Sequence, residues 1–196
     1  MPNGSKSESQ TDFYRKKEIT VLIWESERLY ARKLTAEDYA ECCALLQDAE
    51  VMYAYEHAFS DDEVRDWLDR QLARYEADGF GLWALVRRED GVVIGQAGLT
   101  MQECDGKRMP EIGYLLKKAY WHQGYATEAA RACKAYAFDV LRLDTVYSII
   151  RENNLPSQRV AQRNGMVPVG CTVKHYYHMD MPHILYAVCA DDGEKR

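Results

Sequence analysis

Long hydrophobic segments and paired cysteine motifs are both missing from this 196-residue sequence. No apolar run approaches the roughly 20 residues that a membrane-spanning helix requires. The six cysteines form no C-x-x-C pair, and none lies at zinc-site spacing beside the five histidines. We therefore expect no membrane partner, no bound metal, and cysteines that are buried as small hydrophobic residues.

The N-terminal segment and the charge narrow the class of protein further. Residues 1–17, MPNGSKSESQTDFYRKK, have no apolar core of the kind that a signal peptide contains. We expect a cytoplasmic protein with a loosely ordered polar tail at 1–17 and a single domain at 18–196. The net charge of −6 and the pI of about 5.4 argue against nucleic acid as a partner. The charge is compatible with a cationic acceptor but decides little by itself.

Hydrophobic periodicity predicts a mixed α/β chain. Strand-like patterns cover 28–34, 82–87, 92–101, 111–116, 145–150, 169–176 and 184–189. Helical patterns run from Thr35 to about Asp48, from the capping box at 60–63 to 79, over 126–141 and over 156–164. In the third helix, one buried face is predicted for Ala129, Ala130, Cys133, Ala137, Val140 and Leu141. Asp-Gly turns at 90–91 and 105–106 predict an antiparallel meander, within a mixed sheet covered by helices.

The stretch with the clearest chemical meaning is 111–130, EIGYLLKKAYWHQGYATEAA. A strand ends near Leu116, a short loop follows, and a long helix begins near Ala126. Gly124 has no side chain to block converging backbone N–H groups, and the first helical turn offers unpaired N–H groups with partial positive charge. This pattern predicts an anion site suited to a pyrophosphate, although an ordinary strand-to-helix turn is also compatible with it.

The same stretch resembles the GNAT superfamily of N-acetyltransferases, and most closely the branch of the ribosomal-protein N-terminal acetyltransferases RimJ and RimL. That branch has a run close to E-I-G-Y-x-L-x-x-x-Y-W-x-x-G-Y-A-T-E-A, and nearly every position is present at 111–129. The superfamily pattern [RQ]-x-x-G-x-[GA] falls on Trp121, Gly124 and Ala126, with tryptophan in the first place. The segments ENNLPS at 152–157 and RNGM at 163–166 resemble further motifs of the family.

The resemblance implies an α+β fold of the GNAT type, with a mostly antiparallel central sheet, a splayed strand pair and flanking helices. It also implies acetyl-CoA as cosubstrate and a primary amine as acceptor, with direct attack in a ternary complex. In the family, the pantetheine arm lies where two central strands part, and backbone N–H groups of the loop bind the pyrophosphate. The implied cofactor-binding residues are Leu115, Leu116, Trp121, His122, Gln123, Gly124, Tyr125, Ala126, Thr127, Asn154 and Ser157.

Two residues are predicted to take part in proton transfer. Glu111 is the candidate base, because family members often use a glutamate on this strand; a purely structural carboxylate is the alternative. Ser157 is the candidate partner of the departing thiolate, and a helix-start residue is the alternative. Many members of the superfamily have a tyrosine that acts as the general acid four residues later. This chain has Ala161 there, so the sequence does not identify the residue that protonates the thiolate. A backbone N–H near Leu116 is the predicted donor to the thioester oxygen.

The sequence does not identify the acceptor amine, and a protein N-terminus and a small-molecule amine are both compatible with it. Family members line the acceptor pocket with the segment that matches Tyr53, Tyr55, Glu56 and His57, while core packing is the other interpretation. The histidines at 175, 178 and 183 are irregularly spaced and are expected on the surface or beside the acceptor. A non-catalytic acyl-CoA sensor is the alternative function. The oligomeric state, including a homodimer, is open.

Overall fold

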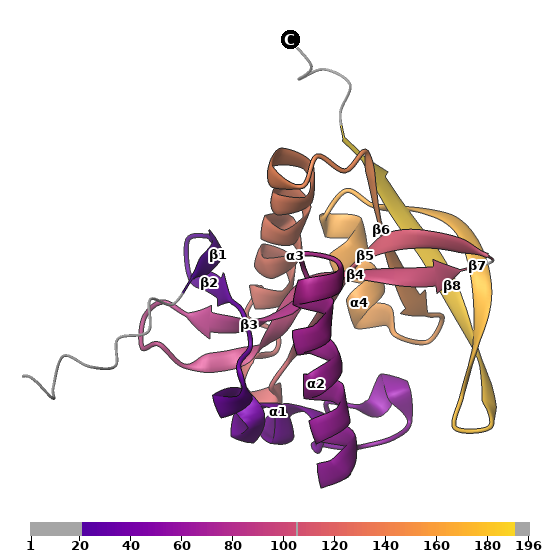
Figure 1. Cartoon of the computed structure of the whole chain (residues 1–196). Helices are drawn as coiled ribbons and strands as arrows, with labels where there is room; N and C mark the ends of the chain where they lie inside the picture. The colour runs from indigo at the N-terminus through magenta and orange to yellow at the C-terminus, as the bar shows by residue number, and fades with distance from the viewer. Residues whose placement is uncertain (1–20, 105, 191–196) are drawn as a thin grey trace, which may run out of the picture.

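The computed structural model describes residues 21–104 and 106–190, so the predicted tail at 1–17 and the turn residue Asp105 lie outside the described residues. Eight strands form one sheet in the order β1-β2-β3-β4-β5-β6-β8-β7. The strands are β1 Leu22–Glu25, β2 Leu29–Arg32, β3 Leu82–Arg87, β4 Val93–Cys104, β5 Lys107–Leu116, β6 Thr145–Arg151, β7 Val167–Tyr176 and β8 Met179–Cys189. The α-helices are α1 Tyr39–Leu46, α2 Asp61–Ala77, α3 Tyr125–Ala135 and α4 Leu155–Arg163 (Figure 1).

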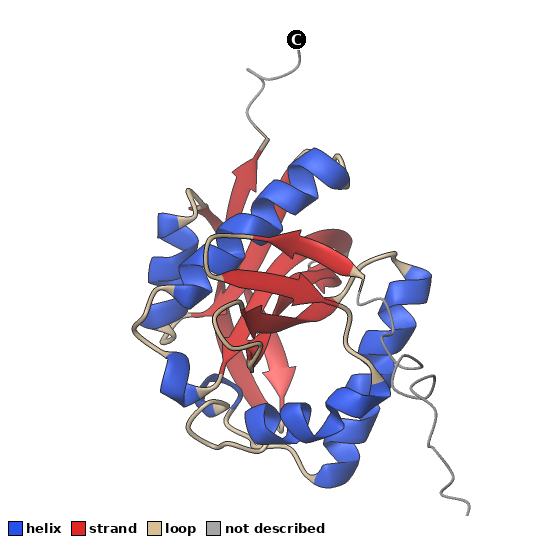
Figure 2. Cartoon of the chain, turned by 90° about the vertical axis from the view of Figure 1, so that its left-hand side faces the viewer, coloured by secondary structure: helices blue, strands red, loops and turns tan. Residues whose placement is uncertain are grey.

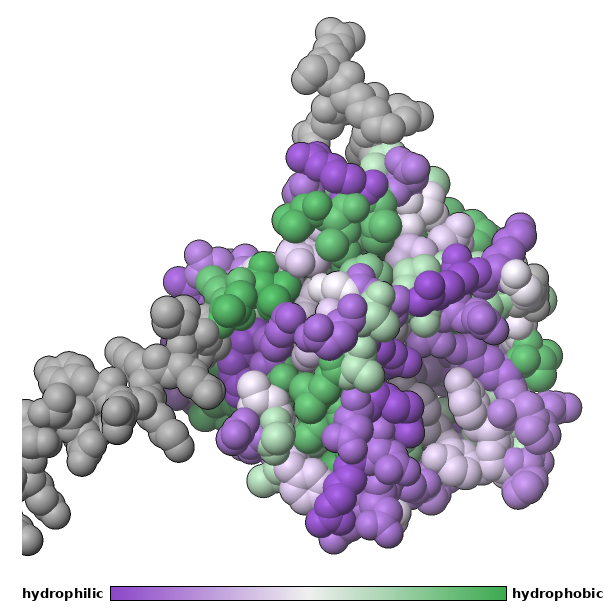
Figure 3. All heavy atoms as spheres, in the orientation of Figure 1, coloured by the Kyte–Doolittle hydropathy of each residue, from purple (hydrophilic) through white to green (hydrophobic). Residues whose placement is uncertain are grey.

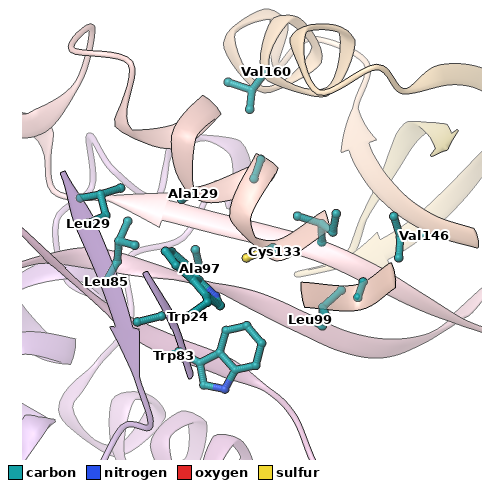
Figure 4. Packing of buried hydrophobic residues seen from close by; sticks show 14 of the residues in the cluster. Trp24, Leu29, Trp83, Leu85, Ala97, Leu99, Ala129, Cys133, Val146 and Val160 are labelled. Carbon is teal, nitrogen blue, oxygen red and sulfur yellow. The ribbon is translucent and has the colours of Figure 1, made fainter. Parts of the chain in front are cut away.

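Helices cover both faces of the sheet, as the side view shows (Figure 2). Side chains of β3 alternate between two hydrophobic clusters, because successive residues of a strand point to opposite faces. Trp83 and Leu85 pack with α3 and α4, whereas Ala84 and Val86 pack with α1 and α2. Figure 4 shows the first of these clusters, in which Ala129 and Cys133 of α3 lie over the sheet. No helix in the described part of the chain is long and apolar enough to cross a membrane.

Local sequence signals account for the starts of the helices. Ser60 caps α2 in a reciprocal capping box, in which the Ser60 N–H donates to Glu63 Oε2 at 2.8 Å and the Glu63 N–H donates to Ser60 Oγ at 3.3 Å. Asn154 caps α4 through its Oδ1, which accepts the Ser157 N–H at 3.2 Å. Both helices therefore begin close to the places that the sequence predicts.

Three features differ from the sequence-based expectation. The predicted strand at 28–34 is shortened to Leu29–Arg32, and it pairs with β1, which the pattern did not predict. The first helix starts as a 3-10 turn, Ala36–Asp38, before α1. The prediction that Val140 is buried is wrong, since its exposed fraction is 60%. The cause is a π-helical turn over Tyr136–Val140, whose extra residue per turn rotates Val140 off the buried face.

The splayed strand pair is present at the centre of the sheet. β3, β4 and β5 form the predicted antiparallel meander, and β6 pairs with β8 in the antiparallel sense. β5 and β6 run parallel, and within the described residues they pair at one position, Glu111 with Tyr147. Beyond this point the two strands separate toward Leu116 and Arg151. The expected mixed sheet with a splayed pair is confirmed, and the opening positions the site.

Candidate functional site

A cavity of about 820 Å³ lies where β5 and β6 part. Its lining comes from both faces of the sheet. On the α3 and α4 side it includes Gly124, Thr127 and Ser157, and on the α2 side it includes Glu111 and Arg74. A molecule in the cavity could therefore reach from the start of α3, through the opened sheet, to the side chains under α2.

The loop before α3 has the backbone form that an anion site needs. His122 and Gly124 both have left-handed backbone angles, with φ of +60° and +84°, and Gly124 is the N-cap of α3. The N–H groups of the following turn have no partner within the helix. An added Cβ at Gly124 would lie 3.4 Å from Arg28 Nη2. Glycine is thus favoured here by its backbone angle, and the loop can present several N–H groups to an anion.

Arg28, which the sequence did not indicate, ties this loop to the β1–β2 turn. Its Nη1 donates to the Gln123 carbonyl at 3.0 Å, while its Nε and Nη2 each lie 2.7 Å from Glu128 Oε2 in α3. Ser26 Oγ and the Arg28 backbone N–H both donate to Glu128 Oε1 at 2.8 Å. Burial opposes ionisation of Glu128, but these hydrogen bonds outweigh it and lower its pKa. The network holds the peptide that precedes Gly124 in one orientation.

A second group of contacts surrounds Ser157. Asn154 Oδ1 accepts from the Tyr53 hydroxyl at 2.8 Å as well as from the Ser157 N–H, and the Tyr114 hydroxyl donates to the Ser157 carbonyl at 3.0 Å. Burial raises the pKa of both tyrosines, so both phenols hold their protons at neutral pH. Ala161 is 1% exposed within the core and does not line the cavity. Tyr53 and Tyr114 therefore bring phenols near Ser157, where the tyrosine of the superfamily is missing.

The end of β5 presents a free edge to the cavity. The Lys117 N–H donates to the Ile94 carbonyl of β4 at 2.9 Å. Because successive N–H groups of an extended strand point to opposite edges, the Leu116 N–H points away from β4 and into the opening. The Leu116 carbonyl accepts from Trp121 Nε1 at 2.8 Å, which fixes the loop against the strand. This geometry suits Leu116 as a donor to a developing oxyanion.

Glu111 lies at the point where the strands part. Its Oε1 accepts the Ile149 N–H of β6 at 3.0 Å, and its side chain lines the cavity. Burial is the largest influence and raises its pKa, while Lys174, the Ile149 N–H and Arg74 act in the opposite direction. A carboxylate whose pKa is raised is a stronger base, which is what general base catalysis near neutral pH requires.

The segment predicted to line an acceptor pocket lies at the α2 side. Tyr53, Ala54 and Tyr55 line the cavity, and Glu56 pairs with Arg151 of β6 at 2.6 Å. His57 stacks on Tyr177 of the β7–β8 hairpin, with ring centroids 4.2 Å apart. Figure 3 shows a hydrophilic surface over α2 that is hollowed between this helix and the hairpin.

The histidines near the C-terminus are separated in space. His175 pairs with Asp180 on the surface at 2.9 Å, His178 is exposed, and His183 lines the cavity with its Nδ1 2.6 Å from the Met181 carbonyl. Burial lowers the pKa of His183. Within the described residues, no group of three or more His, Cys, Asp or Glu side chains is arranged to hold a metal ion.

The cavity thus gathers almost all of the predicted site. Eleven of the twelve predicted residues line it, from Glu111 and Leu115 on β5 to Asn154 and Ser157 at α4. Gln123 does not line it, and its side-chain amide instead donates to the Ala119 carbonyl at 3.0 Å. The roles of these residues in binding and catalysis stay predictions.

Comparison with known proteins identifies the GNAT acetyltransferase family. The sequence model of the family described as "Acetyltransferase (GNAT) domain" matches residues 28–167. The chain is 31% identical over 142 residues to the uncharacterized protein YkkB of Bacillus subtilis (strain 168), which covers 72% of this chain and 83% of that protein. It is 25% identical to the uncharacterized N-acetyltransferase YoaA of the same organism, over 82% of this chain and 92% of the relative.

Solved structures share the fold. An acetyltransferase of the GNAT family from Bacillus anthracis superposes with a TM-score of 0.72 at 23% identity, covering 84% of this chain and 96% of that one. RimL, a ribosomal L7/L12 alpha-N-protein acetyltransferase solved in complex with coenzyme A, superposes with a TM-score of 0.71 at 16% identity, covering 87% and 98%.

Proposed function

Since this chain belongs to the GNAT acetyltransferase family, we propose that it transfers the acetyl group of acetyl-CoA to the nitrogen of a primary amine. The observation that carries the proposal is the cavity at the strand opening, which joins the loop before α3 to Glu111. Such a cavity allows the cosubstrate to enter from one face of the sheet and the acceptor from the other. Both substrates can then be present together, so direct transfer needs no covalent intermediate on the enzyme.

Residues of the loop and of β5 would hold the cosubstrate. The backbone N–H groups of 122–127, at the positive end of α3, fit the charge of a diphosphate. The free edge of β5 near Leu115 and Leu116 fits an extended amide-containing arm that pairs with it like a strand. The described residues fit coenzyme A in these two respects. Acetyl-CoA supplies a thioester whose carbonyl carbon accepts the lone pair of the amine.

Three groups of this chain would then carry the chemistry. Glu111 takes the proton from the attacking nitrogen, directly or through a water molecule. The Leu116 N–H stabilises the negative charge that develops on the thioester oxygen. The hydroxyl of Ser157 supplies a proton for the departing thiolate. The backbone carbonyl of Ser157 accepts from Tyr114, and Asn154, which caps this turn, accepts from Tyr53. Ala161 stands where many family members have a tyrosine. Tyr53 and Tyr114 are therefore the candidates that return a proton to the Ser157 hydroxyl oxygen.

The test is thiol release from acetyl-CoA across a panel of peptides with different N-termini and small amines, measured as a function of pH. Only the neutral amine has a lone pair, so the rate is expected to rise through the titration of the acceptor, which lies near 8 for an α-amine and near 10 for a lysine amine. Thiol release that stays flat with pH when chemistry limits the rate would contradict attack by a free amine. Tight binding of acetyl-CoA without release on any amine would instead identify a sensor.

A further inference from the structure

The acceptor end of the cavity, on the α2 side of the sheet, is lined by the charged side chains of Glu111, Arg74 and Lys174. Register places its lining on one face of the sheet, because residues paired across strands point to the same side. Thr100 pairs with Glu111, and Lys174 pairs with Met181, which lies two residues before the cavity-lining His183. This is the face that α2 covers, and Arg74 of α2 lines the cavity from above.

The charges at this end do not balance. Arg151 is neutralised by Glu56 at 2.6 Å. Of the two other cations that face Glu111, neither Arg74 nor Lys174 has a carboxylate oxygen within 4.0 Å in the described part of the chain. Among the described residues, the hydrogen-bond acceptor of Arg74 Nη1 is the neutral Gln71 Oε1, at 3.1 Å. Apart from the Arg151–Glu56 pair, the lining at this end has one negative and two positive side chains even with Glu111 ionised.

Arg74 is also poorly solvated. Burial is the main cause that lowers its pKa and the charge of Arg70 adds to it, while Asp78 and Glu111 compensate only in part. A guanidinium stays charged under all ordinary conditions, so a half-buried one without an anion is costly and attracts one. An acceptor that enters with only an ammonium group would be repelled by both cations. An acceptor that also carries a carboxylate would neutralise them.

We infer that the acceptor is a primary amine that carries a carboxylate, which Arg74 and Lys174 bind while the amine faces Glu111. Arg74 can grip a carboxylate through two parallel N–H groups, and Lys174 adds a point charge from β7. The same cations favour loss of the ammonium proton, so they help to produce the nucleophile. A free amino acid and a peptide with an acidic residue near its N-terminus both have this chemistry. The inference rests on the proposed acetyl transfer and narrows its substrate class.

The test compares matched acceptors in the thiol-release assay. Free amino acids are paired with their α-carboxamides, and peptides with Asp or Glu in the second position with their Asn or Gln counterparts. We expect free amino acids, or peptides, or both to be acceptors. Within such a pair, kcat/KM calculated for the neutral amine should be roughly tenfold to hundredfold higher for the acceptor that carries the carboxylate. The carboxylate raises the pKa of its neighbouring amine, so uncorrected rates would be biased against this result.

Three variants assign the preference to the pocket. Arg74→Leu is expected to reduce the ratio of kcat/KM within each matched pair to about twofold or less, and this ratio cancels any effect of the lost charge that both members share. Arg74→Lys should keep part of the preference because the charge remains. Arg65→Leu, at an exposed position earlier on α2 and outside the cavity lining, is the control and should leave this ratio unchanged. Equal rates for both members, or a preference that survives Arg74→Leu, would overturn the inference. Thiol release from no amine at all would overturn the proposed function itself.

Discussion

Gly124→Val is expected to weaken coenzyme A binding by about 100-fold, equivalent to ~2.7 kcal/mol, in a chain that still folds. Gly124 has a φ of +84°, a backbone form that costs a β-branched residue about 1–2 kcal/mol. The new side chain would also contact Nη2 of Arg28, whose Nη1 donates to the Gln123 carbonyl. The loop must therefore shift, and the N–H groups proposed to bind the diphosphate shift with it. Calorimetric titration with coenzyme A measures the effect.

Gly91→Val is the matched control for this variant. Gly91 has a φ of +71° in the β3–β4 turn, and an added Cβ there would have no atom within 4 Å. The backbone strain is similar, but the position is outside the cavity lining. Both variants should unfold at similarly reduced temperatures, while only Gly124→Val loses affinity. Equal affinity of Gly124→Val and the unchanged protein would refute the loop as the diphosphate site.

Glu111→Gln is expected to lower kcat/KM by about 10²–10⁴-fold with little change in the affinity for coenzyme A. The amide oxygen of glutamine can still accept the Ile149 N–H, so the contact between β5 and β6 is retained. What is lost is the capacity to take a proton from the attacking nitrogen. Steady-state kinetics with the best acceptor, together with calorimetry, separate the chemical step from binding.

The pH profile adds a second readout for Glu111. Burial raises its pKa, so the carboxylate becomes protonated, and inactive as a base, at a higher pH than an exposed glutamate would. Activity should thus fall on the acid side as pH drops through this raised pKa, and Glu111→Gln should lack that limb. Glu103→Gln, an exposed carboxylate of β4 outside the cavity lining, is the control and should keep the full profile. An unchanged acid limb in Glu111→Gln would show that another group is the base.

Local patterns were sufficient for most of the fold. The alternating runs from 82 to 116 and the Asp-Gly turn at 90–91 predict β3, β4 and β5, because both signals act over a few residues. β1 was missed since it has only four residues, and its pairing with β2 depends on the tertiary structure. The π turn at Tyr136–Val140 was missed for a related reason, because a helical pattern does not reveal a local change of pitch.

Some residues of the site can be predicted from a local motif, and others are brought together only by the tertiary structure. One contiguous motif locates Glu111, Leu116 and the loop at Gly124, because strand, loop and helix follow each other in the chain. Tyr53 reaches Asn154 across 101 residues, and Arg28 reaches Glu128 across 100. No local pattern encodes such contacts. The sequence did not indicate Arg74 and Lys174 as site residues. They lie in the cavity with Glu111 because the fold places α2 and the β7–β8 hairpin around it.

A diffraction structure of the protein with coenzyme A tests the central claim most directly. We expect the diphosphate oxygens within hydrogen-bonding distance of the backbone nitrogens of 122–127. The sulfur should lie in the opening between β5 and β6, with Glu111 on one side and Ser157 on the other. Coenzyme A bound at another surface, or no binding at saturating concentration, would contradict the account.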